Sequence, residues 1–211
     1  MSSKELGLAV IGSGRIGSLR AILSSGHPAI KFLGVSDINI NNAKKLAQRC
    51  NANKYTDNNY ELISDPNVTT VIVSTSEHDH YDAVMHALEL GKPVLVEKPI
   101  ALNIDEADKM IKKSKEANTL FRVGYAQRFK RRYLSGKDQL VEGRIGNILS
   151  ISARACNTRA QGIEILKRSP TATPVVDVLT YWVDVACWYL EGICLLYTSP
   201  SPRDKRQSRM P

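Results

Sequence analysis

Apolar residues recur along the chain in two alternating patterns. Short, mostly apolar or β-branched runs are typical of parallel strands buried on both faces, and they lie at residues 6–11, 32–36, 70–75, 93–96 and 120–124. Segments with apolar positions at helical spacing lie between these runs, at residues 18–24, 41–50, 60–64, 80–90 and 104–117. This alternation predicts an α/β fold with a doubly wound parallel sheet.

The regular alternation ends near residue 124. Residues 128–141 and 175–190 have helical spacing, whereas residues 147–155 alternate like a strand of a partly exposed sheet. We therefore expect a first domain, the incomplete start of an α+β second domain, and a separate tail, at residues 1–123, 124–193 and 194–211.

The composition, with 43% hydrophobic and 24% charged residues, is that of a globular protein rather than a disordered one. No apolar run approaches the roughly 20 residues of a membrane-spanning helix, and the N-terminal residues lack the apolar stretch of a secretory signal. We therefore expect a cytoplasmic protein with no membrane partner. The net charge of +8 is raised by the tail, and because no nucleic-acid motif accompanies it, we expect no nucleic-acid partner.

Cysteines and histidines give no metal signature. The four cysteines have no CxxC or Cys/His spacing, which favours free thiols without a chemical role at Cys50, Cys156, Cys187 and Cys194. His78 and His80 are two residues apart, but no third ligand lies nearby in the sequence. Capping of the following helix by Asp79 or a neighbouring hydroxyl explains this stretch better, so we predict no metal site.

A glycine motif follows the first predicted strand. Gly12, Gly14 and Gly17 form the pattern GxGxxG between a strand and a helix. The first glycine permits a tight turn, the second lets the backbone approach a pyrophosphate, and the third lets the helix pack against the strand. The helix N-terminus, with Arg15 and Ile16 in the motif, would offer N–H groups to the phosphates. An ordinary strand-to-helix turn is the alternative, but this context predicts a Rossmann dinucleotide site formed by all five residues.

Asp37 lies at the end of the second predicted strand, 20 residues after Gly17. An acidic side chain at this place accepts hydrogen bonds from the ribose hydroxyls of NAD, and it would repel the 2′-phosphate of NADP. We therefore expect NAD as the cofactor, with NADP less favoured, although Arg15 or a nearby lysine could offset the repulsion. A simple turn residue at the strand end is the alternative interpretation of Asp37.

Two polar clusters follow later strands, at the edge where open α/β sheets bind ligands. Ser74, Thr75 and His80 follow the third apolar run and are predicted to line the path of the cofactor. Glu97 and Lys98 follow the fourth run and precede a proline. A lysine held there by the neighbouring carboxylate and the rigid proline could hydrogen-bond a substrate hydroxyl beside the nicotinamide, whereas a surface Glu–Lys pair is the alternative.

Together these motifs resemble the Gfo/Idh/MocA family of sugar and polyol dehydrogenases, over about residues 5–192. The resemblance rests on the glycine motif, the loop at 74–80 with its following helix, the segment Glu97-Lys98-Pro99 and residues 124–129. It implies that Lys98 contacts both the nicotinamide and the substrate, and that the peptide before Pro99 is cis.

The family also carries a helical Asp-x-x-x-His motif, whose histidine serves as the acid and base in hydride transfer. The matching residues here are Asp177 and Tyr181, so a tyrosine replaces the histidine. The resemblance implies that Asp177 orients the substrate. Tyr181 could donate a proton during ketone reduction but is a weak base at neutral pH, and a pocket wall without proton transfer is an equal alternative.

The resemblance implies an oxidoreductase that transfers a hydride between NAD and a sugar or inositol-like polyol, and that forms a homo-oligomer at full length. Residues 194–211 resemble a translated sequencing adaptor, with a genuine disordered tail as the alternative. We therefore expect a C-terminally truncated chain that binds the cofactor without turnover. A non-catalytic NAD(P)-binding or regulatory relative is the other candidate, because the histidine is missing.

Overall fold

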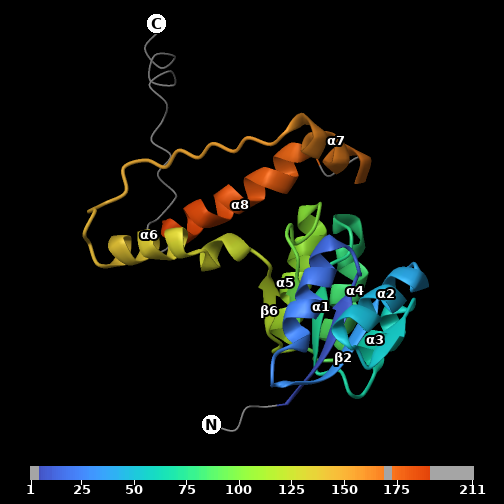
Figure 1. Ribbon diagram of the computed structural model, residues 1–211. Coiled ribbons are helices and arrows are strands. Elements are labelled where there is room, and N and C mark those ends of the chain that lie inside the picture. The colour runs from blue at the N-terminus through green and yellow to red at the C-terminus, as the bar shows by residue number, and fades with distance from the viewer. Residues whose placement is uncertain (1–4, 169–172, 191–211) are drawn as a thin grey trace, which may run out of the picture. The chain divides into compact units, whose positions relative to one another are not determined.

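The computed structural model describes residues 5–168 and 173–190, and the predicted tail at 194–211 lies outside these residues (Figure 1). The chain divides into two compact units, Met1–Tyr125 with Cys156–Thr180 and Ala126–Ala155 with Tyr181–Pro211. All strands of the described residues belong to the first unit.

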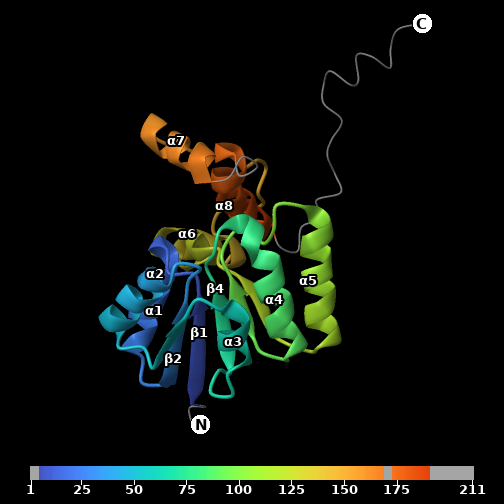
Figure 2. The ribbon, with the colours of Figure 1, turned by 90° about the vertical axis from the view of Figure 1, so that its right-hand side faces the viewer.

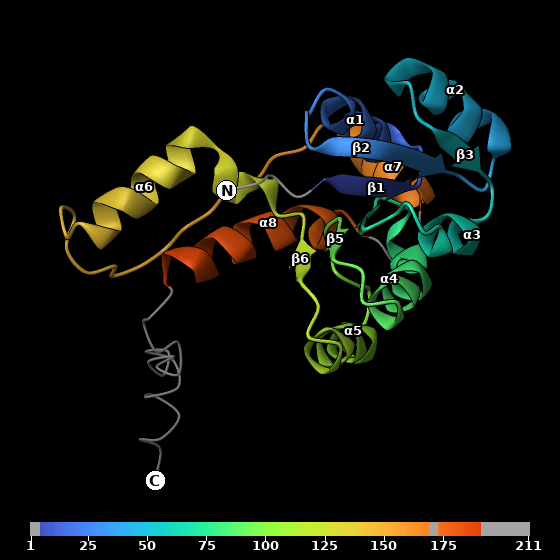
Figure 3. The ribbon, with the colours of Figure 1, turned by 90° about the horizontal axis from the view of Figure 1, so that it is seen from below.

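A six-stranded parallel sheet forms the centre of the first unit (Figure 2, Figure 3). The strand order is β3-β2-β1-β4-β5-β6, so the chain crosses over between β3 and β4 and places β1 in the interior. The strands are β1 (Leu6–Ile11), β2 (Ile30–Ser36), β3 (Lys54–Thr56), β4 (Thr70–Val73), β5 (Val94–Val96) and β6 (Phe121–Val123). The predicted doubly wound α/β fold is confirmed.

Helices cover both faces of this sheet. They are α1 (Arg15–Ser25), α2 (Ile40–Cys50), α3 (Asn59–Ser64), α4 (His80–Glu89) and α5 (Ile104–Glu116). Figure 2 shows α1 and α2 on one side of the sheet and α4 and α5 on the other. A short 3₁₀ helix, η1 (Glu77–Asp79), leads into α4.

Alternate side chains of β1 face two separate cores, as the period of a strand requires. Leu8 and Val10 pack with buried residues of α1 and α2. Ala9 and Ile11 pack with buried residues of α3, α4 and α5. Because β1 is buried on both faces, its sequence is an unbroken apolar run rather than an alternating one.

Asparagine side chains begin three of the helices. Asn39, Asn58 and Asn103 each precede a helix and accept a hydrogen bond from a backbone N–H in its first turn. Helix α1 differs, because its N-cap is Gly14 and no side chain caps it. The helix also begins three residues before the predicted range of 18–24, directly inside the glycine motif.

One strand and one helix were not predicted. Strand β3 has three residues, and its tyrosine side chain, Tyr55, is 44% exposed. Such a short edge strand has no apolar run that would reveal it. Helix α7 (Arg159–Arg168) is likewise a new element, with Ile163 and Leu166 largely exposed.

The predicted strand at 147–155 is wrong, because those residues have no regular secondary structure. Leu149 is 97% exposed, and no described residue pairs with this segment. An isolated strand is not stable without hydrogen-bonded neighbours, so the alternating pattern alone does not form one.

The second unit is helical within the described residues. It contains the 3₁₀ helix η2 (Ala126–Phe129), α6 (Arg131–Val141) and the C-terminal part of α8 (Pro174–Tyr189). The Tyr189 hydroxyl donates to the Tyr133 carbonyl at 2.9 Å, and Arg128 makes two hydrogen bonds to the Asp184 carboxylate at 2.8 and 2.6 Å. These contacts join α6 and η2 to α8. No helix of the described residues is long and apolar enough to cross a membrane.

Candidate functional site

The three glycines of the motif do three different things in the first unit. Gly12 has a φ of +92°, and a Cβ there would lie 2.7 Å from the Ser74 carbonyl oxygen. A Cβ at Gly17 would lie 1.8 Å from the Gly12 carbonyl oxygen, so helix α1 packs against the loop that precedes it. Gly14 has open space, with no heavy atom beyond its chain neighbours within 4 Å of an added Cβ. The motif therefore forms a tight turn, and the space beside its middle glycine is open to a ligand.

The N-terminus of α1 lies at this open glycine. No side chain caps the helix, and its first turn holds no acidic residue. Arg15 is exposed and Ile16 half-buried at this end of the helix. Uncapped N–H groups and the positive end of the helix dipole together favour an anion such as a pyrophosphate.

Asp37 lies beside the glycine loop. One oxygen of its carboxylate, Oδ2, accepts a hydrogen bond from the Ser13 N–H at 2.9 Å. The other, Oδ1, accepts from the Asn39 N–H at 2.9 Å and from the Asn42 side chain at 3.4 Å. The half-buried carboxylate therefore shapes a strand-end turn and also reaches the loop, and Oδ2, which accepts one hydrogen bond, keeps accepting capacity for a ribose hydroxyl.

Three buried polar atoms follow the end of β4. Ser74 Oγ, Thr75 Oγ1 and His80 Nε2 have no hydrogen-bond partner among the described residues. Leaving a buried polar atom unsatisfied costs about 1–3 kcal/mol, so such atoms mark a place where a polar ligand binds. Ser74 also packs against the glycine loop, since its Cβ lies 3.4 Å from the position that a Gly17 Cβ would take. These features fit a dinucleotide that carries hydrogen-bonding groups along its length.

The predicted capping of α4 is wrong. Asp79 is the N-cap residue, but its side chain makes no capping hydrogen bond and lies 3.3 Å from His78 instead. The His80 side chain is 1% exposed, and its Nδ1 lies 3.1 Å from the Pro99 carbonyl oxygen. Burial lowers the pKa of the His80 imidazole below its usual value. Within the described residues, no three His, Cys, Asp or Glu side chains form a group suited to a metal ion.

Glu97 and Lys98 face different partners. The Glu97 carboxylate receives Nε and Nη2 of Arg20 at 2.8 and 2.6 Å, and it leaves no room for a Cβ at Gly124. The prediction that this carboxylate holds the lysine is therefore wrong, because Glu97 instead ties the end of β5 to α1. Sequence reasoning missed Arg20, which lies 77 residues away from its partner.

Lys98 pairs with Asp177 of helix α8. Its Nζ lies 2.5 Å from Asp177 Oδ1 and 3.1 Å from the Asp177 carbonyl oxygen. The two side chains are 12% and 16% exposed, and both belong to the first unit. The Lys98–Pro99 peptide is cis, as the resemblance implied. An ammonium and a carboxylate thus lie side by side at the carboxyl end of the sheet, where substrates of open α/β folds bind.

Tyr181 follows Asp177 by four positions in α8, so it lies one turn further along the same helix. It is the first residue of the second unit's share of that helix.

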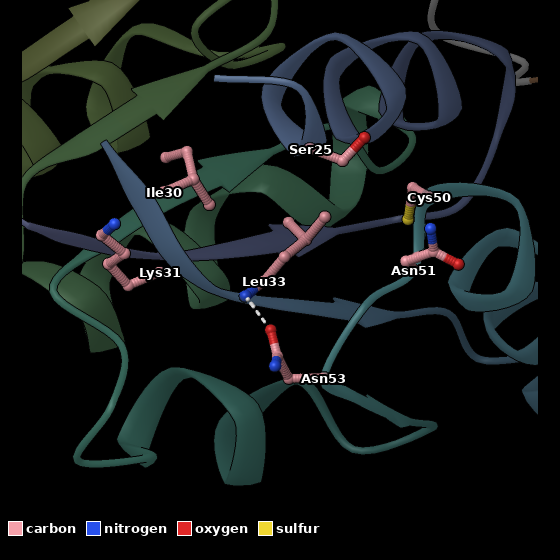
Figure 4. A pocket seen from close by; sticks show the side chains of 7 residues that line it. All are labelled: Ser25, Ile30, Lys31, Leu33, Cys50, Asn51 and Asn53. Atoms are coloured by element: carbon pink, nitrogen blue, oxygen red, sulfur yellow. Dashed lines mark hydrogen bonds between the residues drawn. The ribbon is translucent and has the colours of Figure 1, made fainter. Parts of the chain in front are cut away.

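A shallow surface hollow of about 140 Å³ lies at the opposite, amino end of the sheet (Figure 4). Residues from the end of α1, the start of β2 and the turn after α2 line it, namely Ser25, Ile30, Lys31, Leu33, Cys50, Asn51 and Asn53. Asn53 Oδ1 accepts a hydrogen bond from the Leu33 N–H at 2.8 Å beside it. None of the predicted site residues lines this hollow.

Several curated relatives of the chain are inositol dehydrogenases by name. The scyllo-inositol 2-dehydrogenase (NAD(+)) of Bacillus subtilis is 31% identical over 162 residues, which cover 76% of this chain and 47% of the relative. The inositol 2-dehydrogenase of Gluconacetobacter diazotrophicus is 31% identical over 194 residues, which cover 89% of this chain and 55% of the relative. The chain thus spans about half the length of the curated relatives it matches.

Solved structures share the fold. The scyllo-inositol dehydrogenase of Lactobacillus casei superposes with a TM-score of 0.81 at 20% identity, over 90% of this chain and 56% of that one. A probable dehydrogenase from Thermotoga maritima gives a TM-score of 0.77 at 29% identity, over 89% and 55% of the two chains.

The profile of an oxidoreductase family with an NAD-binding Rossmann fold matches residues 6–125, more than half of the chain. On this match the chain belongs to the Gfo/Idh/MocA family of oxidoreductases.

Proposed function

We propose that this chain carries the NAD site and part of the catalytic site of a polyol dehydrogenase whose substrate is an inositol or a similar sugar alcohol. The observation that carries the proposal is the partly buried ion pair of Lys98 and Asp177 at the carboxyl end of the sheet. The names of the relatives support an inositol as substrate, and Asp37 supports NAD over NADP.

The predicted cofactor residues would each hold a different part of the dinucleotide. Gly12, Gly14 and Gly17, with Arg15 and Ile16, would receive the pyrophosphate at the start of α1. Asp37 would accept hydrogen bonds from the adenosine ribose. Ser74, Thr75, His80 and Glu97 would line the way toward the nicotinamide, which supplies a hydride acceptor when bound.

Lys98 and Asp177 would act on the substrate. Oxidation of a secondary alcohol moves a hydride from carbon to the nicotinamide and releases the hydroxyl proton. The Lys98 ammonium lowers the energy of the oxyanion that develops on the substrate oxygen. Asp177 accepts a hydrogen bond from a neighbouring hydroxyl and orients the ring. Tyr181 stands at the position of the family histidine. Its hydroxyl can give a proton to the ketone in reduction, and in oxidation its deprotonated form would take the hydroxyl proton from the substrate.

Turnover tests the proposal. We expect the full-length protein to form NADH from NAD and scyllo- or myo-inositol, and Lys98→Met to lower kcat by about 10²- to 10⁴-fold. Lys112→Met is the matched control, because Lys112 is 78% exposed and its nearest carboxylate is 3.8 Å away. If the protein binds NADH but oxidises no polyol, the proposal is wrong and the protein is a non-catalytic NAD-binding module.

Tyr181→Phe separates proton transfer from a wall of the pocket. A fall of kcat with an unchanged KM supports the proton role, because phenylalanine keeps the ring and removes the hydroxyl. An unchanged kcat would assign the residue to the wall.

Homo-oligomeric assembly and a cytoplasmic location stay predictions, and light scattering of the full-length protein tests the first.

A further inference from the structure

His80 is a buried histidine whose tautomer follows from its contact. It is the first residue of α4 and 1% exposed, and its Nδ1 lies 3.1 Å from the Pro99 carbonyl oxygen. A carbonyl oxygen only accepts hydrogen bonds, so Nδ1 carries a hydrogen and donates it. Burial favours the neutral ring, which leaves Nε2 without a hydrogen.

The acceptor of this bond belongs to the segment that carries Lys98. Strand β5 ends at Val96, and residues 97–100 follow it without regular secondary structure. The Glu97 N–H donates to the Val73 carbonyl at 2.9 Å, and Arg20 holds the Glu97 side chain. Lys98 therefore lies between two tethers, one at the preceding residue and one at the carbonyl of the following proline.

These two contacts fix the backbone from which the long Lys98 side chain extends toward Asp177. The Lys98 ammonium meets Asp177, a residue 79 positions further along the chain. A lysine side chain has four rotatable bonds, so the direction in which its backbone starts decides whether the ammonium arrives beside the carboxylate. Displacements of about 1 Å at a reacting centre lower rates by about 100-fold.

We propose that His80 is a positioning residue, which donates its Nδ1 hydrogen to the Pro99 carbonyl and thereby holds the Lys98 backbone so that the ammonium faces the substrate. The proposal rests on the proposed dehydrogenase function for its kinetic consequence. The hydrogen bond itself is independent of that function and is tested separately.

Three substitutions distinguish this role from simple packing. His80→Asn keeps an N–H donor at the δ position, His80→Gln moves the donor to the ε position, and His80→Phe keeps a ring without a donor. In the full-length protein we expect kcat for inositol oxidation to fall by about 100-fold in the Gln and Phe variants and by less than about 10-fold in the Asn variant. Equal losses in the Asn and Gln variants would overturn the proposal.

Imidazole ¹⁵N resonances of the wild-type protein test the bond directly, with no measurement of turnover. The chain has only four histidines, so comparison with His80→Asn assigns the His80 signals. We expect a protonated Nδ1 and a bare Nε2. A bare Nδ1 refutes the proposal even if the protein is an active dehydrogenase.

Amide hydrogen exchange tests the hydrogen bond from His80 even if the protein is not a dehydrogenase. The amides of residues 100 and 101 follow the tethered carbonyl and should exchange faster in His80→Phe than in His80→Asn. If neither protein turns over an inositol, this difference still supports the tether. Identical exchange in the two variants would argue against it.

Discussion

Replacing Gly14 by alanine should leave the stability of the fold nearly unchanged but weaken binding of the cofactor. An alanine Cβ there would meet no heavy atom beyond its chain neighbours within 4 Å, and the φ of −67° and ψ of −168° are open to any L-residue. Alanine restricts the unfolded chain, which stabilises by about 0.4–1 kcal/mol, but it is a poorer N-cap than glycine by a similar amount. We therefore expect Gly14→Ala to change the free energy of unfolding by less than about 1 kcal/mol.

The same methyl group would occupy the space in front of the helix N-terminus. A pyrophosphate displaced from there loses at least one hydrogen bond to a charged group, worth about 1.5–3 kcal/mol. The Kd for NADH should therefore rise by roughly 10- to 150-fold.

Fluorescence titration with NADH, run beside urea unfolding, measures both quantities. Gly26→Ala is the control, since Gly26 also has open space and a negative φ of −83° but lies at the other end of α1. It should leave the Kd unchanged. A Gly14→Ala protein with wild-type stability and wild-type NADH affinity would refute the placement of the pyrophosphate.

Three further predictions concern packing, cofactor choice and pH. Gly17→Ala should lower the free energy of unfolding by about 3 kcal/mol or more in urea, because the Cβ would lie 1.8 Å from the Gly12 carbonyl oxygen; a fully stable variant contradicts this. Asp37→Ala should narrow the difference between the Kd values for NADH and NADPH, and an unchanged ratio would exclude Asp37 as the discriminating group. Because burial lowers the pKa of His80 in the folded protein, the unfolded chain takes up its proton first as the pH falls below the ordinary histidine pKa of 6.5. The stability advantage of the wild type over His80→Asn should then shrink by up to about 1.4 kcal/mol per pH unit until the folded His80 also protonates, and an advantage that is constant with pH would contradict it.

Long apolar runs made most of the first unit predictable from sequence. The run at 6–11 matches β1 without error, because an interior strand buried on both faces leaves an unbroken apolar signal. Strand β3 was missed because an exposed edge strand of three residues carries no such signal. The segment at 147–155 failed for a different reason, since alternation predicts a strand only where a neighbouring strand exists to pair with it.

The sequence predicted which residues belong to the candidate site, but not which of them pair with one another. Spacing and resemblance singled out Lys98 and Asp177, and the structure brings them to 2.5 Å. Neighbours in sequence suggested that Glu97 holds Lys98, yet the two side chains bind different partners in the structure. Glu97 accordingly pairs with Arg20 on another helix, a partner that no local pattern indicates.

The interior position of β1 has a consequence for synthesis of the protein. The ribosome completes this strand at Ile11, but its neighbour β4 begins only at Thr70. At roughly 5–20 residues per second, about 3–12 s pass before that neighbour is made. During this interval one edge of a fully apolar strand is open to other nascent chains. Translation that stops before β4 should therefore yield products that associate through β1 instead of folding.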